Sequence, residues 1–306
     1  MLTEEQAQRK YLLGIWQNLP LNLKVRKTQA RIKEWYESHD GMVYVSFSGG
    51  KDSTALLHLV RDMYPDVPAV FVDTGLEYPE IRQFVKRYEN VTIIRPKMPF
   101  HEVIKKHGYP IVSKKVAHMV RYLQRPTEKN APTRHLTMTG IHPVTGKEMR
   151  FWKLPEKWKP LIDAPFPVSD ACCDVMKKRP FHAYNKSSGR FPFIGTMTAD
   201  SEQRAKTYVR SGCNAFNAKH PSSQPMAFWK DGDVWQYLKE NNVPYCDIYD
   251  KGETRTGCVF CMFGVHMDGE PNRFQRLKQS HPKMHDYCMD RLGIRKCLEF
   301  IDVPCE

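Results

Sequence analysis

The chain has 306 residues and a formal charge of +13, with 41% apolar and 26% charged residues. These shares are typical of a globular protein, and no apolar run approaches the roughly 18 residues that a membrane helix needs. The N-terminus carries acidic residues early and lacks the basic-then-apolar order of a secretory signal. We therefore expect a cytoplasmic protein without a membrane partner.

Residues 1–40 are predicted to form an N-terminal helical segment. Leu12, Ile15 and Trp16 have the spacing of one helix face, and a second amphipathic stretch follows Pro20. Gly41 is expected to end this segment.

Apolar runs then alternate with helical stretches. Strands are predicted at MVYVSF, 69–75, 91–96 and 191–196, and helices at 53–63 and 79–89. Such alternation favours parallel strands joined by right-handed crossovers. The predicted fold is therefore an α/β class with a doubly wound, mostly parallel sheet. A further helix is expected after Asp231 or Asp233, either of which is a suitable N-cap.

This rhythm divides the chain into five predicted parts. They are an N-terminal helical segment at 1–40, a first half of the core at 41–104, a basic insertion at 105–165, a second half of the core at 166–264, and a helical C-terminal region at 265–306. Inside the insertion, the run HLTMTGIHPVTGKEMRFWKL predicts a hairpin, because two alternating segments flank a turn with Pro and Gly.

The insertion holds most of the positive charge. Between Lys105 and Lys159 there are 13 Lys and Arg but only three acidic residues. Such a run is usually a solvated surface, yet these cations alternate with aromatic residues such as Trp152 and Trp158, as they do on nucleic-acid-binding surfaces. Both interpretations remain open, with nucleic acid as a candidate partner of residues 105–160.

The run FSGGKDSTALL lies between a predicted strand and a predicted helix. Two glycines, a lysine and several hydroxyls at a helix N-terminus can surround an anion. The run is not a Walker A loop, because Val45 stands where that motif has Gly and Asp52 follows the lysine in place of Ser or Thr. A P-loop kinase or GTPase is therefore disfavoured.

The loop resembles the SGGxDS fingerprint of the PP-loop ATP pyrophosphatases, which cut ATP between the α and β phosphates and have an adenine nucleotide α-hydrolase-like fold. The resemblance implies that ATP and Mg²⁺ bind here and that Lys51, Asp52 and Ser53 are catalytic. The implied nucleotide-binding residues are Ser46, Ser48, Gly49, Gly50, Lys51, Asp52, Ser53, Asp73, Thr74, Gly75, Gly195 and Arg204.

Further matches narrow the resemblance to the phosphoadenylyl-sulfate (PAPS) reductase branch. They are FIGTMTADSEQRAKTY, FWKDGDVWQYL and VPYCDIYDKGETRTGCVFC. One departure is Met197, which stands where the family often has an arginine.

Two cysteine pairs predict a metal centre. Cys172 and Cys173 are adjacent, and Cys258 and Cys261 form a CxxC. Four thiolates suit either tetrahedral Zn²⁺ or a [4Fe–4S] cluster, and the spacing alone does not choose between them. Adenylyl-sulfate reductases are similar in using a CC…CxxC quartet for an iron–sulfur cluster, which favours [4Fe–4S]. The alternative is that these cysteines are ordinary buried apolar residues, as free cysteines often are. If one of the four does not bind the metal, Cys213 is the substitute ligand.

Two reactions fit this resemblance. A sulfonucleotide reductase attacks an adenylyl sulfate with a C-terminal cysteine in an ECGLH-like motif. That motif is absent from this chain, and Cys297 and Cys305 are the candidates near the C-terminus for the attacking cysteine. Sulfurtransferases of DNA phosphorothioation and tRNA thiolation instead adenylate a substrate with ATP, release pyrophosphate and insert sulfur. The intact SGGKDS favours this second reaction, with a sulfur-donor protein such as a cysteine desulfurase as a partner. A non-catalytic nucleotide-binding or partner-binding module is the remaining alternative.

Overall fold

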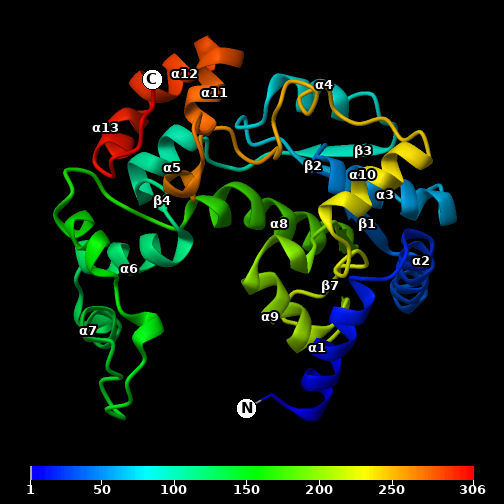
Figure 1. The fold of residues 1–306 in the computed structure, drawn as a ribbon, viewed down its shortest axis with the longest axis horizontal. Coiled ribbons are helices and arrows are strands. Elements are labelled where there is room, and N and C mark those ends of the chain that lie inside the picture. The colour runs from blue at the N-terminus through cyan, green and yellow to red at the C-terminus, as the bar shows by residue number, and fades with distance from the viewer. Residues whose placement is uncertain (1) are drawn as a thin grey trace. The chain divides into compact units, whose positions relative to one another are not determined.

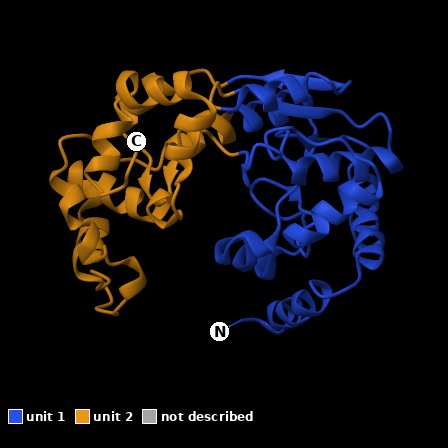
Figure 2. Ribbon diagram, turned by 45° about the horizontal axis from the view of Figure 1, so that its top comes forward, with its two compact units in different colours: residues 1–73, 77–95, 180–256 blue, residues 74–76, 96–179, 257–306 orange. Residues whose placement is uncertain are grey.

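The computed structural model describes residues 2–306 and divides into two compact units (Figure 2). Unit 1 comprises residues up to 73, 77–95 and 180–256. Unit 2 comprises residues 74–76, 96–179 and 257–306. Each unit is therefore assembled from segments that lie far apart in the sequence. The division into five parts that the sequence suggests remains a prediction.

Unit 1 contains an α/β core (Figure 1). Its strands are β1 (Val43–Ser46), β2 (Ala69–Val72), β3 (Val91–Ile94), β5 (Phe191–Ile194), β6 (Asn214–Ala215) and β7 (Ser222–Ser223). Its helices are α1 (Glu4–Trp16), α2 (Leu21–Ser38), α3 (Lys51–Met63), α4 (Pro79–Val85), α8 (Arg179–Ser188, from its second residue on), the 3₁₀ turn η5 (Thr198–Asp200), α9 (Glu202–Ser211) and α10 (Asp231–Glu240).

The six strands form one sheet in the order β3-β2-β1-β5-β7-β6. All pairings are parallel except the one between β6 and β7. The chain first builds outward from β1 to β3 and then returns to the other side of β1 with β5. This is a doubly wound, mostly parallel sheet, and the predicted fold class is confirmed. In such sheets, ligands bind beyond the carboxyl ends of the strands where the strand order reverses.

The central strand β1 is buried on both faces, because its side chains alternate between two helical layers. Tyr44 packs against the rings of Phe181 and Tyr184 in α8 and donates a 2.7 Å hydrogen bond to Asn185. The helix α3 contacts β1 and β5, and α2 and α10 pack on α3.

Two buried polar contacts fix the layer of α2 and α10. Lys24 is almost fully buried, and its ammonium lies 2.5 Å from a carboxylate oxygen of Asp233. That carboxylate also accepts the backbone N–H of Lys230, which is the N-cap of α10, so Asp233 caps the helix from its third residue and the predicted N-cap position is wrong. The indole N–H of Trp229 donates to Thr28 at 2.8 Å. Pairing of these buried groups satisfies hydrogen bonds that would otherwise be lost on folding.

Unit 2 is mainly helical. Its helices and turns are α5 (Phe100–His107), α6 (Lys114–Gln124), η1 (Glu128–Asn130), α7 (Ala131–Thr139), η2 (Arg150–Trp152), η3 (Glu156–Asp163), the π-helix η4 (Asp174–Lys178), η6 (Val265–Met267), α11 (Arg273–Ser280), α12 (Pro282–Asp286), the π-helix η7 (Tyr287–Arg291) and α13 (Ile294–Glu299). Two short strands, β4 (Ile111–Val112) and β8 (Met262–Phe263), pair in parallel. The helical C-terminal region is confirmed by α11 to α13.

The hairpin predicted from residue 135 is wrong in its first half. Residues up to Thr139 belong to α7, which begins with Pro at its first turn and ends at Gly140 in the left-handed conformation. What remains of the hairpin is a short turn closed by a single antiparallel bridge between Ile141 and Glu148. The alternating run also has helical spacing, and Pro132 is well suited to a first helical turn.

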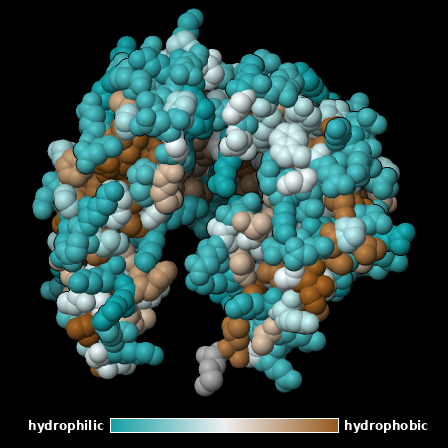
Figure 3. Space-filling model, viewed as in Figure 1, coloured by the Kyte–Doolittle hydropathy of each residue, from teal (hydrophilic) through white to brown (hydrophobic). Residues whose placement is uncertain are grey.

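No helix among described residues 2–306 is long and apolar enough to cross a membrane. The face drawn in Figure 3 is covered mainly by hydrophilic residues, with apolar residues in small groups.

Candidate functional site

The SGGKDS loop connects β1 to α3 in unit 1. Gly49 has a positive φ of 74°, and a Cβ there would lie 2.9 Å from a methyl group of Val85. A Cβ on Gly50 would lie 2.5 Å from the hydroxyl of Thr256. Gly49 is therefore required for its backbone conformation, and a side chain at Gly50 would have to displace the hydroxyl of Thr256.

Two serines hold the loop in its curved form. The hydroxyl of Ser53 donates to the carbonyl of Gly50 at 2.9 Å and accepts the backbone N–H of Ser48 at 3.1 Å. The hydroxyl of Ser48 accepts the N–H of Gly50 at 3.3 Å. These bonds keep the loop closed over the first turn of α3, where backbone N–H groups have no helical partner.

The ammonium of Lys51 lies between two carboxylates. It is 2.7 Å from Asp52 and 2.6 Å from Asp231, and the lysine side chain is only 6% exposed. Burial alone would lower the pKa of Lys51, but the two carboxylates outweigh it and raise this pKa above its ordinary value. Burial likewise raises the pKa of Asp52, against the opposing effect of Lys51. Lys51 therefore stays protonated at the N-terminus of a helix, a position that attracts phosphate, while Asp52 and Asp231 compensate its charge in this structure.

A tyrosine occupies the same helix terminus. The backbone N–H of Lys51 donates to the hydroxyl of Tyr249 at 2.8 Å, and this hydroxyl lies 3.1 Å from that of Thr256. The hydroxyl oxygen of Tyr249 thus accepts a hydrogen bond from the kind of N–H group that binds phosphate oxygens in anion sites.

Gly195 packs directly on the loop. It follows β5, whose Ile194 is in register with Ser46 at the end of β1. A Cβ on Gly195 would lie 3.0 Å from the carbonyl oxygen of Asp52 and 3.2 Å from the Cα of Ser53. Only glycine allows this approach without moving the backbone.

Other predicted nucleotide-binding residues have partners of their own. Arg204 pairs with Asp200, one helical turn away. The carboxylate of Asp73 is 8% exposed and lies 2.9 Å from Arg82 and 3.4 Å from Arg95. The predicted residues Thr74 and Gly75 belong to unit 2: the hydroxyl of Thr74 accepts the N–H of Leu76, and Gly75 has a φ of 76°.

The four cysteines of the predicted quartet all belong to unit 2. Burial raises the pKa of Cys172, and electrostatic repulsion from Cys258, Cys173 and Cys261 raises it further. The pKa of Cys261 is also raised, mainly by burial and also by Cys173. Each thiol pair is therefore within electrostatic reach of the other. No group of three or more His, Cys, Asp or Glu in residues 2–306 is arranged for metal binding.

An ion pair fixes the backbone around the CxxC. Asp268 accepts two hydrogen bonds from the guanidinium of Arg273, at 2.7 and 2.8 Å. The same guanidinium donates to the carbonyls of Cys261 and Phe263 at 3.2 and 3.0 Å. Burial alone would raise the pKa of Asp268, but Arg273 outweighs it and lowers this pKa.

A profile of the phosphoadenosine phosphosulfate reductase domain matches residues 42–125 and 115–263, more than half of the chain. The chain belongs to this family. A relative in Methanocaldococcus jannaschii, the uncharacterized protein MJ0973, is 26% identical over 272 residues, which cover 87% of this chain and 52% of the relative. The chain thus spans about half the length of that relative.

Other relatives have named activities. An adenosine 5′-phosphosulfate reductase of Staphylococcus epidermidis is 23% identical over 263 residues, covering 86% of this chain and 87% of the relative. Among solved structures, the PAPS reductase from Candida auris has a TM-score of 0.43 at 16% identity and covers 84% of this chain and 96% of that one. The U34-tRNA thiolase NcsA from Methanococcus maripaludis, solved with its [4Fe-4S] cluster, has a TM-score of 0.38 at 16% identity and covers 93% and 83%. The relatives with named activities are enzymes.

In this member of the PAPS reductase domain family, the structure brings together the predicted loop residues from Ser48 to Ser53, with Gly195 packed on them and Ser46 at the strand end. The four cysteines all belong to unit 2, and three of them are within electrostatic reach of Cys172. Whether these residues bind nucleotide or metal stays a prediction.

Two residues around the loop were not expected from the sequence. Asp231 was considered only as a helix cap, but its carboxylate contacts Lys51. Tyr249 lies in a stretch that resembles the family, but its neighbours in the sequence give no sign that it contacts the SGGKDS loop. Only the fold shows these contacts, because 180 and 198 residues separate the partners in the chain.

The types of donor present match those that the implied groups take. Mg²⁺ is usually held by one or two carboxylates together with substrate phosphates, and Asp52 and Asp231 offer two carboxylates beside the loop. Four thiols match the ligand number of a [4Fe–4S] cluster or of Zn²⁺, although the described residues do not arrange them as a metal site.

The two cysteines nearest the C-terminus, Cys297 and Cys305, are buried. Cys297 is fully buried in α13, where its thiol donates to the carbonyl of Gly293, and burial raises its pKa. Cys305 is 5% exposed, and burial also raises its pKa. Neither thiol has the exposure and lowered pKa that mark a reactive cysteine.

Proposed function

We propose that the chain is a PP-loop ATP pyrophosphatase that adenylates a nucleic-acid acceptor for sulfur transfer. The observation that carries the proposal is the intact SGGKDS loop, with the buried ammonium of Lys51 at the N-terminus of α3. A helix terminus and a fixed lysine stabilise the negative charge that develops on departing pyrophosphate.

The proposed reaction has two steps. An oxygen of the acceptor attacks the α-phosphorus of ATP, and the bond between this phosphorus and the oxygen bridging to the β-phosphorus breaks, so that pyrophosphate leaves. A sulfur nucleophile then attacks the atom that carries the activated oxygen, and AMP leaves with that oxygen. If the donor is a persulfide, a thiol must also supply two electrons. A cysteine desulfurase is a suitable sulfur-donor partner.

The chain's own residues bind and orient the nucleotide. In this proposal, Lys51 contacts the β and γ phosphates, and the hydroxyls of Ser48 and Ser53, which accept the N–H groups of Gly50 and Ser48, hold the loop in shape. Asp52 and Asp231 would hold Mg²⁺, which would neutralise further phosphate charge when bound.

The four cysteines would hold a [4Fe–4S] cluster, with Zn²⁺ as the less favoured occupant. When bound, the cluster would supply an iron–sulfur centre beside cations: Lys177 lies within electrostatic reach of both Cys172 and Cys261. A cation there favours thiolates over thiols, as ligation requires.

A nucleic-acid acceptor is supported by charge. The excess of 13 basic over three acidic residues between Lys105 and Lys159 lies within unit 2, which also holds the four cysteines. Phosphate backbones bind such surfaces by releasing counterions. The proposal includes a cytoplasmic location for the protein.

A sulfonucleotide reductase is the second candidate, because relatives with similar coverage are named adenosine 5′-phosphosulfate reductases. That reaction would yield sulfite from an adenylyl sulfate and would depend on a late cysteine. The burial of Cys297 and Cys305 disfavours the reductase reaction, because the attacking thiol must reach the substrate. A non-catalytic nucleotide-binding module would release neither product.

The test is pyrophosphate release from ATP and Mg²⁺ by anaerobically purified protein, with and without DNA or RNA. We expect release that increases with one nucleic acid and is absent without ATP. Sulfite formation from adenylyl sulfate and thioredoxin, lost in Cys297→Ser or Cys305→Ser, would instead support the reductase. Absence of both products would support the module.

A further inference from the structure

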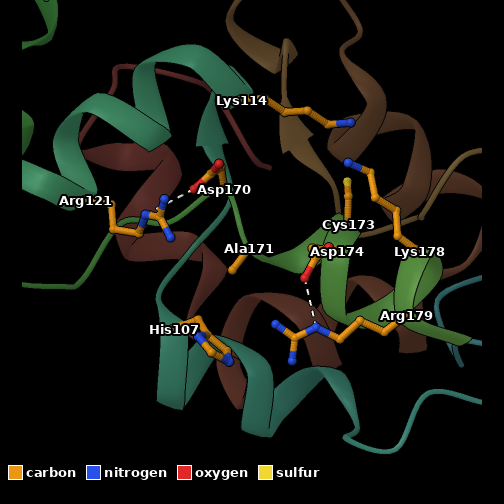
Figure 4. Close-up of a pocket in the computed structure, with 9 residues that line it drawn as sticks. All are labelled: His107, Lys114, Arg121, Asp170, Ala171, Cys173, Asp174, Lys178 and Arg179. Carbon is orange, nitrogen blue, oxygen red and sulfur yellow. Dashed lines mark hydrogen bonds and ion pairs between the residues drawn. The ribbon is translucent and has the colours of Figure 1, made fainter. Parts of the chain in front are cut away.

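A pocket of about 360 Å³ lies in unit 2 beside one cysteine of the quartet (Figure 4). Lys114 at the start of α6 and Lys178 in η4 line it together with Cys173. Arg121 of α6 and Arg179 complete the set of permanent cations. Two carboxylates, Asp170 and Asp174, are the only acidic groups in the lining. The lining is therefore positive overall.

The two arginines are already neutralised. Arg121 lies 3.2 Å from Asp170, and Arg179 lies 2.8 Å from Asp174. The two lysines are not: neither Lys114 nor Lys178 has an ion-pair partner in the described part of the chain. The uncompensated charge of this pocket is therefore carried by the lysine pair.

The lysines converge on one place. Figure 4 shows both ammonium groups directed toward each other near the sulfur of Cys173. Two like charges that point into one pocket repel each other, and the repulsion is relieved when an anion lies between them. A cation run on a solvated surface would instead spread its charges apart.

His107, which also lines the pocket, is surrounded by cations that act on its pKa. Burial lowers the pKa of His107, and the cations Lys106, Arg179, Arg125 and Arg121 lower it further. A neutral imidazole keeps one N–H donor, so His107 adds a hydrogen-bond donor to the pocket lining.

We propose that this pocket binds a phosphodiester of the acceptor nucleic acid between Lys114 and Lys178, and so presents the acceptor to the four cysteines. The inference rests on the proposed nucleic-acid substrate and deepens it by naming the contact. Lysine ammonium groups bind phosphate as point charges and read no base sequence, so the pocket fixes position rather than sequence.

The test compares two double variants of anaerobically purified full-length protein. Lys114→Ala with Lys178→Ala removes the pocket pair. Lys239→Ala with Lys283→Ala removes the same charge from exposed positions outside residues 105–160. All four lysines are exposed, so thermal denaturation should show that both variants fold.

The readout is fluorescence anisotropy of short labelled single-stranded DNA and of RNA with the same sequence, titrated across a range of salt concentrations. The pocket pair should weaken binding at least about fivefold near 0.1 M salt and lower the slope of log K against log salt by about 0.7 for each lost phosphate contact. The control pair should change affinity less than about twofold. Lys114→Arg with Lys178→Arg should restore binding. Whichever of DNA or RNA shows this dependence is the acceptor class.

Equal effects of the two double variants would overturn the inference, because binding would then depend on the overall charge and not on the pocket. An unchanged affinity with loss of bound iron would also overturn it, because the lysines would then serve the cluster. Failure of the proposed function is measured separately: it requires that wild-type protein release no pyrophosphate, whatever its oligonucleotide affinity.

Discussion

The backbone N–H of Lys51 donates a 2.8 Å hydrogen bond to the hydroxyl of Tyr249. This bond lies at the first residue of α3, where helices attract anions. The proposed ATP binding therefore requires an exchange: a phosphate oxygen replaces the tyrosine hydroxyl as the acceptor. Tyr249 holds the loop in shape while no anion is bound.

Tyr249→Phe removes this acceptor without removing the ring. We expect a loss of about 0.5–1.5 kcal/mol in the free energy of unfolding, together with ATP binding that is unchanged or up to about tenfold tighter, because the ligand no longer displaces the hydroxyl. Urea denaturation and calorimetry check the two effects. Tyr245→Phe is the matched control, since that hydroxyl contacts only Asp250 at an exposed position. Weaker ATP binding in Tyr249→Phe would mean that the hydroxyl contacts the nucleotide itself.

Gly195→Ala tests the packing of β5 on the loop. The new Cβ would lie 3.0 Å from the carbonyl oxygen of Asp52, and backbone atoms cannot rotate away. We expect a destabilisation of about 1–3 kcal/mol and weaker ATP binding. Gly232→Ala is the control: it lies in α10 with no atom within 4 Å of the new Cβ and should be neutral or slightly stabilising. Similar losses in both variants would show that Gly195 has no special role.

Cys258→Ser tests the proposed cluster. Iron and acid-labile sulfide should fall to background after anaerobic purification, because a four-thiolate site loses one ligand. Cys213→Ala is the matched control. Cys213 is a buried cysteine of unit 1 whose electrostatic partners are Arg31, Glu34, Lys27 and Tyr208, and its loss should leave iron unchanged. Zinc in place of iron in the wild type would contradict the proposed cofactor.

The pair of Asp268 and Arg273 predicts a pH dependence. The pKa of Asp268 is lowered in the folded protein, so its ion pair stabilises the fold above the unfolded pKa of about 3.9 and is lost as the pH falls through the folded value. Asp268→Asn should cost about 1–3 kcal/mol at pH 7. The difference from wild type should shrink in urea denaturation below about pH 3.9.

Glu202→Gln serves as the control for this pH dependence, because Glu202 is fully exposed and pairs only with Lys206. A constant difference between Asp268→Asn and wild type across the acid range would refute the ionic origin of the stabilisation.

The strands and the first helix of the unit 1 core could be predicted from the sequence alone. The apolar runs ending at Ser46, Val72 and Ile194 are strands, and the SGGKDS loop begins α3 as predicted. Buried parallel strands and helix starts leave strong local patterns, because burial and capping each restrict residue type at fixed spacing.

Contacts between distant segments could not be predicted in this way. Asp231 and Tyr249 reach Lys51 only because α10 and the segment after it fold back onto α3, and their own neighbourhoods in sequence describe an ordinary helix start and a turn. The error at residues 135–139 has another cause, since a short run such as HLTMT fits both the strand and the helix period.

The central claim is that the loop at Lys51 binds the phosphates of ATP. The most direct measurement is calorimetric titration of ATP with Mg²⁺ into wild-type protein and Lys51→Ala, with the exposed Lys239→Ala as a control. Loss of a charged hydrogen bond predicts that ATP binds Lys51→Ala about 10 to 100 times more weakly, while Lys239→Ala matches the wild type. Wild-type protein that does not bind ATP, or equal affinity in Lys51→Ala, would contradict the account.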